Sequence, residues 1–419
     1  MAEARTSVEE HLDRVLATIT ALPPVEVTLA EAAGRVLAAD VAAAVAVPRF
    51  DHAAMDGFAV RAAEVASASS GTPVELPVVG TVAAGDAVHP LPEGAAIRIM
   101  TGAPVPPGAD LVVPFEWTSG TDPVRIRQPA PAGRHIRRAG EDVAAGEVAL
   151  RAGARLGPAQ LGLLAAVGRP TVSLRPRPRI AVISTGAELV DPAKGHTLRP
   201  EGARSAVGAV ADSNTATLAA AAHAAGAEVS SYGPVTDDAV AFRDVLAAAA
   251  ESTDLVVTTG GISAGDHDVV KAALHDVEGF WFGPVAIRPG RPQGVGTVTT
   301  ADRRRVPVVT LPGTPVAAYS SFLLFVLPAL RALAGGPPEP RQRATLGAPV
   351  QATDRTVLLP AAYDDHGRVS PLPGHAGHSQ RLLAEADALL VVPPTGVLLA
   401  TGDVVEVIGL ASRYDTAGC

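Results

Sequence analysis

The sequence predicts a multidomain α/β protein with a doubly wound, mainly parallel α/β domain, an inserted β-rich module and a small C-terminal β domain. Between residues 179 and 335, strand-like apolar runs alternate with helical patterns, which is typical of a mainly parallel sheet covered by helices on both faces. Before and after this stretch, short apolar runs are separated by proline and glycine clusters, which favours small β domains. A length of 419 residues agrees with about three domains at roughly 150 residues each.

The N-terminal part of the chain is expected to contain two helices around an inserted module. The first helix, Ser7–Ile19, opens with a serine that can cap it, a glutamate three residues on, and apolar residues that share one face. The second, Gly157–Val167, begins near a proline, which suits the first helical turn. We expect residues 1–47 and 138–178 to form a linking domain and residues 48–137 to form the β-rich module.

The α/β domain is expected to span residues 179–335 and the C-terminal β domain residues 341–412. In chain order, starting with a strand, the predicted strands and helices of the α/β domain are Ile180–Ser184, Ala209–Ala225, Glu228–Tyr232, Asp238–Glu251, Leu255–Val257, Asp268–His275, Val306–Leu311 and Pro315–Leu333. By composition Gly335–Pro340 is a linker, and the apolar runs Ala388–Val392 and Val404–Ile408 predict strands beyond it.

Composition and charge exclude several classes of protein. The hydrophobic fraction is 47% and the charged fraction 18%, so the chain can build sizeable cores. A formal net charge of −9 argues against nucleic-acid binding, which needs a basic surface. Cys419 is the only cysteine, so neither a disulfide nor a cysteine metal site is expected. Because Met1–Glu10 lacks a secretory pattern and the longest apolar run, Phe322–Leu327, is too short to span a bilayer, we expect a cytoplasmic protein without membrane association.

The first candidate site is a glycine-rich turn that follows the strand Leu255–Val257. Its glycines let backbone N–H groups approach an anion, and the helix beyond adds a favourable dipole. Asp266 and Asp268 can hold the Mg²⁺ that accompanies a phosphate group. The alternative is a tight turn whose aspartates cap the next helix. The glycines and the neighbouring hydroxyl are Gly260, Gly261, Gly265 and Ser263.

Two other predicted strands end in loops of the same kind. Glu188 follows a threonine–glycine turn, and it is either a first-turn helix acid or a carboxylate that binds a metal or ligand. The loop Leu311–Pro315 holds two prolines around a glycine. It is either an ordinary helix start or a rigid pocket wall, and its place at the same sheet edge favours the wall.

Two arginines on a stiffened loop form a third kind of candidate. Arg288 and Arg291 stand around a proline–glycine turn, where they can form a fork for a small oxyanion such as phosphate, sulfate or molybdate. Lone arginines are more often solvated surface residues. In the β-rich module, the pairs Asp56–Gly57 and Thr101–Gly102 read as ordinary turns when taken alone.

Together these segments resemble the molybdopterin molybdenumtransferases of MoeA and gephyrin E-domain type. The matching segments follow the order of the family and cover nearly the whole chain, and the ordered set is far more specific than any one of them. They are Pro48–Val60, Arg98–Glu116, Gly140–Asp142, Ser184–Val190, Asp212–Asn214, Gly260–Asp268, Arg288–Pro292, Leu311–Pro315 and Gly402–Asp403.

The resemblance implies both an architecture and an activity. It implies an α/β domain similar to the molybdopterin-adenylylating fold, and a homodimer whose site lies between one subunit's α/β domain and its partner's β module, with the linking domain used for dimerisation. The implied reaction takes adenylylated molybdopterin and molybdate, inserts molybdenum and releases AMP with Mg²⁺ present. Molybdopterin adenylyltransferase and apo-molybdoenzymes are the implied protein partners. The alternatives are a non-catalytic carrier or scaffold for the cofactor, a transferase that prefers tungstate, and adenylylation of molybdopterin, which the inserted module disfavours.

The resemblance also assigns roles, position by position. The acids that place the metal and the nucleotide phosphate are Glu188, Asp266 and either Asp237 or Asp238. The groups that cradle the pyrophosphate and line the pocket are Thr185, Gly186, Gly260, Gly261, Ser263, Gly265, Pro312, Gly313 and Pro315. The partner subunit contributes Asp56 and Thr101, and Asp142 is a further functional acid. The groups that bind molybdate are Arg288, Arg291 and Ser379.

Several departures from the family pattern fall at the expected site. Arg288 and Arg291 replace two lysines, which keeps the charge but changes reach and hydrogen-bond geometry. Thr314 and Ala317 replace an asparagine and a serine, which removes an amide and a hydroxyl. An aspartate before Glu188 is replaced by alanine as well. Catalytic competence and the preference for molybdate over tungstate are therefore open questions for this chain, which has the character of a diverged paralogue.

Overall fold

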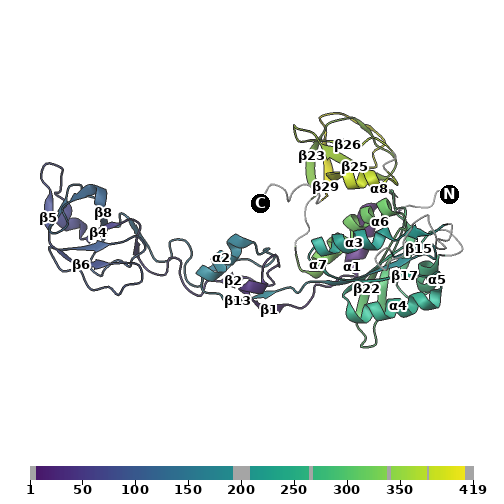
Figure 1. Cartoon of the computed structure of the whole chain (residues 1–419), viewed down its shortest axis with the longest axis horizontal. Helices are drawn as coiled ribbons and strands as arrows, with labels where there is room; N and C mark the ends of the chain where they lie inside the picture. The colour runs from purple at the N-terminus through teal and green to yellow at the C-terminus, as the bar shows by residue number, and fades with distance from the viewer. Residues whose placement is uncertain (1–5, 192–207, 264–267, 337–340, 375–376, 411–419) are drawn as a thin grey trace, which may run out of the picture. The chain divides into compact units, whose positions relative to one another are not determined.

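The computed structural model describes residues 6–191, 208–263, 268–336, 341–374 and 377–410. The chain divides into two compact units, one formed by Met1–Val25 with Arg175–Cys419 and the other by Glu26–Leu174 (Figure 1). The first unit holds the α/β domain and the C-terminal β domain, and the second holds the β-rich module.

The N-terminal helix α1 (Val8–Ala17) begins with the capping box that the sequence predicts. The backbone N–H of Glu10 donates to the Ser7 hydroxyl at 3.0 Å, and the N–H of Ser7 donates to the Glu10 carboxylate at 2.8 Å. The helix buries His11 completely, with its ring 4.6 Å from the centre of Phe325 and 5.1 Å from that of Trp281. The first helix is therefore part of the α/β core.

A six-stranded sheet forms the centre of the α/β domain. Its first four strands pair in parallel, and the last two strands are added through antiparallel pairings. In spatial order the strands are β17 (Glu228–Val235), β14 (Arg179–Thr185), β18 (Leu255–Thr259), β22 (Arg305–Leu311), β21 (Pro292–Thr299) and β19 (Trp281–Pro284). The prediction of a mainly parallel sheet is confirmed.

The two antiparallel strands were missed by the sequence analysis, and glycines explain why. A Cβ at Gly294 would lie 2.6 Å from the Phe282 ring, and one at Gly296 would overlap the Phe280 ring. The rings of Phe280 and Phe282 thus fill the space that side chains at Gly294 and Gly296 of β21 would occupy. A strand with two glycines in its centre shows no apolar alternation, so periodicity does not reveal it.

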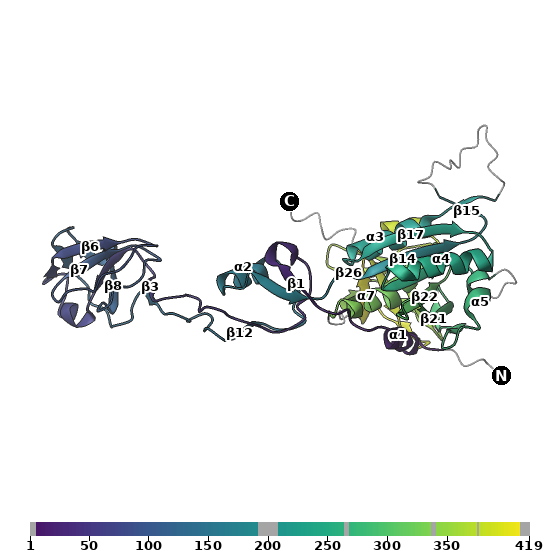
Figure 2. The same cartoon turned by 90° about the horizontal axis from the view of Figure 1, so that it is seen from below.

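Helices cover both faces of the sheet, as Figures 1 and 2 show. On one face lie α3 (Ser213–Ala224) and the run α6 (Pro315–Ser321), a π-helical turn (Phe322–Val326) and α7 (Leu327–Leu333). On the other lie α4 (Ala239–Ser252) and α5 (Val269–Leu274). The expected helix start at Ala209 was wrong, because Val210–Ala211 forms strand β16 with β15 (Leu189–Val190) and Asp212 caps α3.

The continuous run Pro315–Leu333 is long and apolar enough to cross a membrane by length and composition, yet 67% of its apolar window is buried inside the protein. It packs on the central sheet with Phe322, Phe325 and Leu330 in the core. We therefore interpret it as the core helix of the α/β domain.

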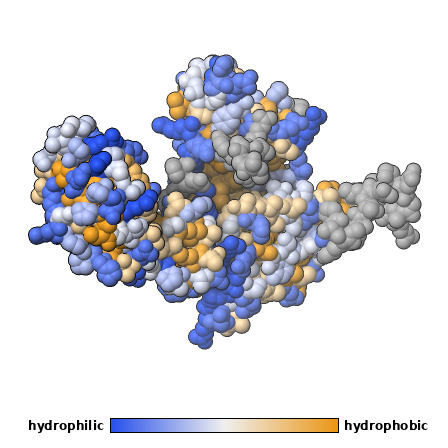
Figure 3. Space-filling model, turned by 60° about the vertical axis from the view of Figure 1, so that its left-hand side comes forward, coloured by the Kyte–Doolittle hydropathy of each residue, from blue (hydrophilic) through white to orange (hydrophobic). Residues whose placement is uncertain are grey.

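A polar hairpin extends from the sheet between β21 and β22, and it is the hydrophilic projection at the bottom of Figure 3. Arg303 and Arg305 are exposed there. Arg304 instead turns inward, and its guanidinium donates to the backbone oxygens of Thr253 at 2.7 Å and Ala250 at 3.0 Å. These carbonyls lie at the C-terminal end of α4, so Arg304 stabilises the end of this helix.

The C-terminal β domain is a barrel-like sheet whose strands close on one another through the pairing of β25 with β27. Its strands are β25 (Thr356–Tyr363), β26 (Arg368–Pro371), β23 (Gln342–Leu346), β29 (Val404–Gly409) and β27 (Ala388–Val392), with α8 (Gln380–Glu385) beside them. The short strand β20 (Ile287–Arg288) comes from the α/β domain and pairs with β25. The two domains of the first unit are therefore joined by a shared ladder.

The second unit is built from small sheets. Within residues 48–137, a four-stranded sheet contains β6 (Val78–Val82), β7 (Ala96–Ile99), β4 (Gly57–Val60) and β8 (Leu111–Pro114), and a three-stranded sheet contains β5 (Val74–Leu76), β10 (Val124–Ile126) and β9 (Thr118–Ser119). The remaining strand pairs are β1 (Val25–Thr28) with β13 (Thr171–Leu174), β2 (Val41–Ala42) with β12 (Val148–Leu150) and β3 (His52–Ala53) with β11 (Ile136–Arg137). The predicted second helix is α2 (Pro158–Ala166).

Candidate functional site

The carboxyl ends of β14, β18 and β22 border a cavity of about 800 Å³. Each strand continues into one of the loops that the sequence analysis singled out, and all three loops line the cavity. Ligands bind at this edge of open α/β sheets as a general rule. A smaller cavity of about 370 Å³ lies between α1, α7 and β29, but its lining is mainly apolar and contains no acid. The cavity at the strand ends is the candidate site, because all three singled-out loops line it.

The glycine turn lies in direct contact with its neighbours. Gly260 has a φ of +94°, and a Cβ there would lie 2.6 Å from the backbone oxygen of Thr185. A Cβ at Gly313 would lie 3.3 Å from the Cα of Gly260. The ends of the three strands thus pack backbone against backbone, and Gly260 is required both for its conformation and for the close approach.

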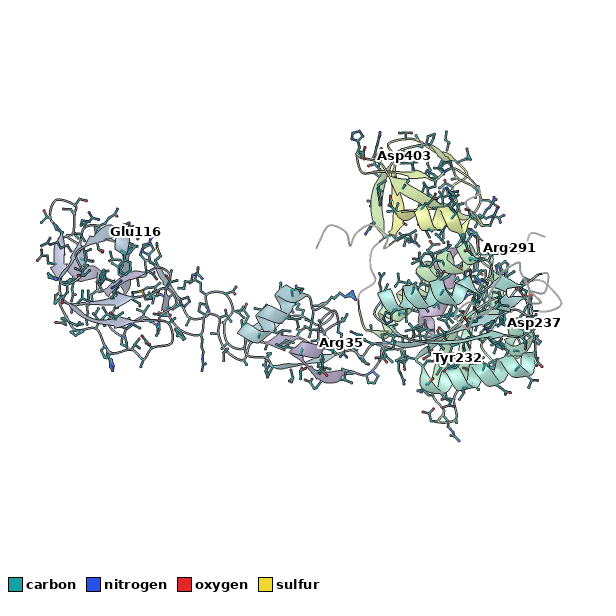
Figure 4. The ribbon with its side chains drawn as sticks, viewed as in Figure 1. Arg35, Glu116, Tyr232, Asp237, Arg291 and Asp403 are labelled. Carbon is teal, nitrogen blue, oxygen red and sulfur yellow. The ribbon has the colours of Figure 1, made fainter. Side chains whose placement is uncertain are left out.

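Two acids of the candidate set line the cavity beside this turn. The Glu188 carboxylate lies over Gly186, whose Cβ position is 2.7 Å from Glu188 Oε2. Asp237 (Figure 4) accepts a hydrogen bond of 3.2 Å from the N–H of Ala187. Asp238 does not line the cavity, because its carboxylate caps α4 by accepting from Val240 at 2.7 Å. Of the two alternatives, Asp237 is the cavity acid.

A third acid, Asp268, also lines the cavity. The Ser263 hydroxyl donates to its Oδ1 at 3.1 Å, whereas its Oδ2 is buried without a hydrogen-bond partner in the described structure. Asp266 and Gly265, to which roles were assigned, lie outside the described residues. Within the described ranges no group of three or more His, Cys, Asp or Glu side chains is close enough to hold a metal ion.

A polar network that the sequence analysis did not assign holds the loops together. The Asn214 amide donates to the Thr259 hydroxyl at 2.9 Å and to the Gly313 oxygen at 2.7 Å. The Thr259 hydroxyl in turn donates to the Pro312 oxygen at 2.8 Å. Asn214 was noted only as part of a matching segment, and its position three residues after the end of β16 gave no signal for this role.

Asp212 fixes the N-terminal end of α3, the helix that carries Asn214. It is buried and accepts hydrogen bonds of 2.6 Å from the hydroxyls of Ser184 and Thr215. The backbone N–H of Thr215 also donates to this carboxylate, at 3.0 Å. Asp212 therefore ties the end of β14 to the first turn of α3 and holds Asn214 against the cavity.

The arginine loop lies at the edge of the site and not within its lining. Pro292 lines the cavity, but Arg288 and Arg291 are not among its lining residues. Both arginines are exposed, with Arg291 on the side that faces the C-terminal β domain (Figure 4). Neither has an ion-pair partner among the residues that the structure describes. The two arginines are thus exposed on the loop whose last residue, Pro292, lines the cavity.

The C-terminal β domain contributes Gln380 to the cavity lining, and not the predicted residue Ser379. Ser379 caps α8, since its hydroxyl accepts from the N–H of Leu382 at 3.2 Å. Gln380 lines the cavity instead, and its amide donates to the Ser213 hydroxyl at 3.0 Å. Sequence analysis missed Gln380, which had no motif to mark it.

In the second unit, Asp56 and Thr101 form a hydrogen-bonded pair. The carboxylate accepts from the N–H and from the hydroxyl of Thr101, both at 2.7 Å. The N–H bond, followed by the hydroxyl bond, lowers the pKa of Asp56 below its ordinary value. Taken alone these residues read as two separate turns, but the structure brings them together. Asp142 is exposed, in a segment where its N–H donates to the oxygen of Val47.

Three family profiles match the chain in succession. They are the MoeA N-terminal region (domains I and II) over residues 6–168, a probable molybdopterin-binding domain over residues 181–332, and the MoeA C-terminal region (domain IV) over residues 343–410. A "Molybdopterin molybdenumtransferase 2" of Mycobacterium tuberculosis is 42% identical over 413 residues, which is 96% of this chain and 98% of the relative. The chain belongs to the molybdopterin molybdenumtransferase family.

Other relatives of the family agree along the full length. "Molybdopterin molybdenumtransferase 1" of the same organism is 36% identical and covers 97% of this chain and 99% of its own. Among solved structures, a molybdopterin biosynthesis MoeA protein from Pyrococcus horikoshii is 31% identical, with a TM-score of 0.80 over 96% of this chain and 98% of that chain. The resemblance and the multidomain α/β fold expected from the sequence are confirmed.

Proposed function

We propose that this molybdenumtransferase family member inserts molybdenum from molybdate into adenylylated molybdopterin and releases AMP. The observation that carries the proposal is the cavity at the carboxyl ends of β14, β18 and β22, which is lined by a glycine turn, hydroxyls and the carboxylates of Glu188, Asp212, Asp237 and Asp268. Such a site suits a nucleotide phosphate with its accompanying cation. The names of the full-length relatives support the same reaction.

We propose that Mg²⁺, which prefers oxygen ligands, binds in this cavity, where carboxylates and the phosphate oxygens of the substrate can supply them. Glu188, Asp237 and Asp268 line the cavity, and the buried Oδ2 of Asp268 has no other partner in the described part of the chain. We propose that these carboxylates hold the ion and that Asp266 joins them. When bound, Mg²⁺ would neutralise charge on the phosphate groups.

The remaining roles are proposed from the positions of the residues. The turn Gly260–Ser263 and the residues Thr185 and Gly186 would hold the pyrophosphate, with the Pro312–Pro315 loop as the opposite wall. Thr314 lines this wall, where the family has asparagine, and Ala317 is buried just behind it. We propose that Arg288, Arg291 and Ser379 bind molybdate, Ser379 from its position as the cap of α8.

We propose further that the chain acts as a homodimer and that Asp56, Thr101 and Asp142 serve the cavity of a partner subunit. The Asp56–Thr101 pair supports this, because it is a pre-formed, exposed anionic group. Mixing Glu188→Ala with Asp56→Ala protein tests it. If each mixed dimer restores one of two sites and half of the dimers are mixed, activity should return to about a quarter of wild type. Mixtures as inactive as either variant would contradict the shared site.

The reaction itself is tested by incubating the purified protein with adenylylated molybdopterin and Mg²⁺ and following AMP. We expect AMP release that depends on molybdate. Tight binding of the substrate without release would show that the chain carries the cofactor precursor and does not transform it. Competition between molybdate and tungstate in the same assay measures which oxyanion the arginine pair prefers.

A further inference from the structure

A buried amide lies beneath the arginine loop. Gln293 follows the loop directly and is 1% exposed. Its Nε2 donates to the backbone oxygen of Gly290 at 2.7 Å and to the hydroxyl of Ser321 at 2.7 Å. Ser321 is fully buried on α6. One side chain thus joins the centre of the arginine loop to a core helix.

The contact between the loop and this helix leaves no free space. Gly290 has a φ of +104°, and a Cβ there would lie 3.0 Å from the Ser321 hydroxyl and 3.7 Å from the Ala317 side chain. The helix that it meets, α6, begins at Pro315, which lines the cavity. The amide therefore sets the arginine loop relative to the cavity wall.

The other anchors of the loop are made by the backbone. At one end Arg288 pairs with Val357 of the C-terminal β domain, and at the other the oxygen of Arg291 accepts from the N–H of Val285 at 2.8 Å. Among the residues that the structure describes, only the central anchor, Gln293, is a side chain. It is the one contact that a substitution can remove without rebuilding a strand.

We propose that Gln293 is a positioning residue for oxyanion binding, because it holds the loop on which Arg288 and Arg291 can form a fork. This inference rests on the proposed role of the two arginines. A guanidinium fork depends on its orientation, since its N–H groups match an oxyanion only in a narrow geometry. An anchored loop keeps that orientation before the anion arrives.

Packing alone does not explain an amide at this position. The Oε1 of Gln293 is buried and has no hydrogen-bond partner among the described residues. A buried, unsatisfied acceptor opposes folding, so an apolar side chain of similar length would suit the core better. Replacement by methionine removes this acceptor but also the donor to Gly290 and Ser321, so it should lower the melting temperature modestly while it releases the loop.

The test is isothermal titration of sodium molybdate and, separately, of AMP into the full-length protein. Gln293→Met should weaken molybdate binding by about tenfold, the size of one lost charge-assisted hydrogen bond, and should leave AMP binding unchanged. Arg291→Ala should weaken molybdate at least as much. The control is Gln351→Met, because the amide of this exposed residue also donates two hydrogen bonds, to the backbone oxygens of Ala352 and Gly396, but belongs to the C-terminal β domain and not to the loop.

The outcomes separate the inference from the proposed function on which it rests. If Arg291→Ala weakens molybdate binding and Gln293→Met does not, the positioning role is overturned while the anion site stands. If Arg291→Ala has no effect, the anion site itself is wrong and the inference fails with it. If Gln293→Met weakens molybdate and AMP equally and lowers the melting temperature well below that of Gln351→Met, Gln293 is only structural.

Discussion

Replacing Gly260 by alanine should damage the site in a way that the structure quantifies. Gly260 has a φ of +94°, a conformation that alanine adopts only at a cost. The added Cβ would lie 2.6 Å from the backbone oxygen of Thr185 and 2.9 Å from its hydroxyl. Neither atom can move without displacing the end of β14, since Thr185 pairs there with the neighbouring strand β17.

A second glycine of the same domain provides the control. Gly226 has a φ of +87°, and no heavy atom lies within 4 Å of its Cβ position. Gly226→Ala therefore carries only the conformational cost, about 1–2 kcal/mol. Gly260→Ala carries that cost and an overpacking cost of about 1–3 kcal/mol, so we expect a total loss of about 2–5 kcal/mol.

Urea denaturation of the two variants, followed by circular dichroism, measures this difference in the free energy of unfolding. Titration of AMP at a temperature where both variants are folded measures the effect on the site. We expect Gly226→Ala to bind AMP like the wild type and Gly260→Ala to lose binding. The reasoning is refuted if the two variants are equally stable and bind AMP equally well, because the close contact with Thr185 would then have no consequence.

Three further predictions concern other residues. Burial, and then the charge of Arg14, lowers the pKa of His11 from 6.5 to about 4, so the stability present above pH 6.5 should fall as the pH drops towards 4, by about 2 kcal/mol at pH 5. His11→Phe should abolish this loss in urea denaturations at pH 7.5 and pH 5. Asn214→Asp should lower AMP affinity at least tenfold, because a carboxylate oxygen would replace the donor that faces the Gly313 oxygen at 2.7 Å; unchanged affinity would remove Asn214 from the site. Glu188→Ala should lose AMP release with no change in melting temperature, and full activity would make this acid an ordinary surface charge.

The parts of the fold that the sequence predicted are those in which local chemistry and burial agree. Helix α1 carries its own capping box, and the strands β14, β18 and β22 are apolar because helices cover both of their faces. The strand β21 could not be found in this way. The apolar groups that pack on it belong to Phe280 and Phe282 of the neighbouring segment. The sequence of β21 alone therefore does not show that this strand is packed.

The residues of the candidate site also differ in whether the sequence could predict them. Residues at strand ends, such as Glu188 and Gly260, could be placed because parallel strands end at a common edge. The sequence does not show whether Asp237 or Asp238 lines the cavity, because the two acids are neighbours in the chain. The answer depends on which carboxylate caps the first turn of α4. Gln380 could not be found at all, because it reaches the cavity from another domain.

The contacts among the three loops explain why several weak motifs made a strong prediction together. Gly260 packs closely against Thr185, and Gly313 packs closely against Gly260, so neither position has room for a side chain. The Asn214 amide joins Gly313 to Thr259 of β18, the strand that precedes the glycine turn. Each loop by itself is an ordinary turn, and only the three loops together form the wall of the cavity. A change in one loop must therefore be matched in the others. The replacement of asparagine by Thr314 leaves the backbone contacts among these loops in place, so we expect it to alter substrate affinity while the cavity keeps its form.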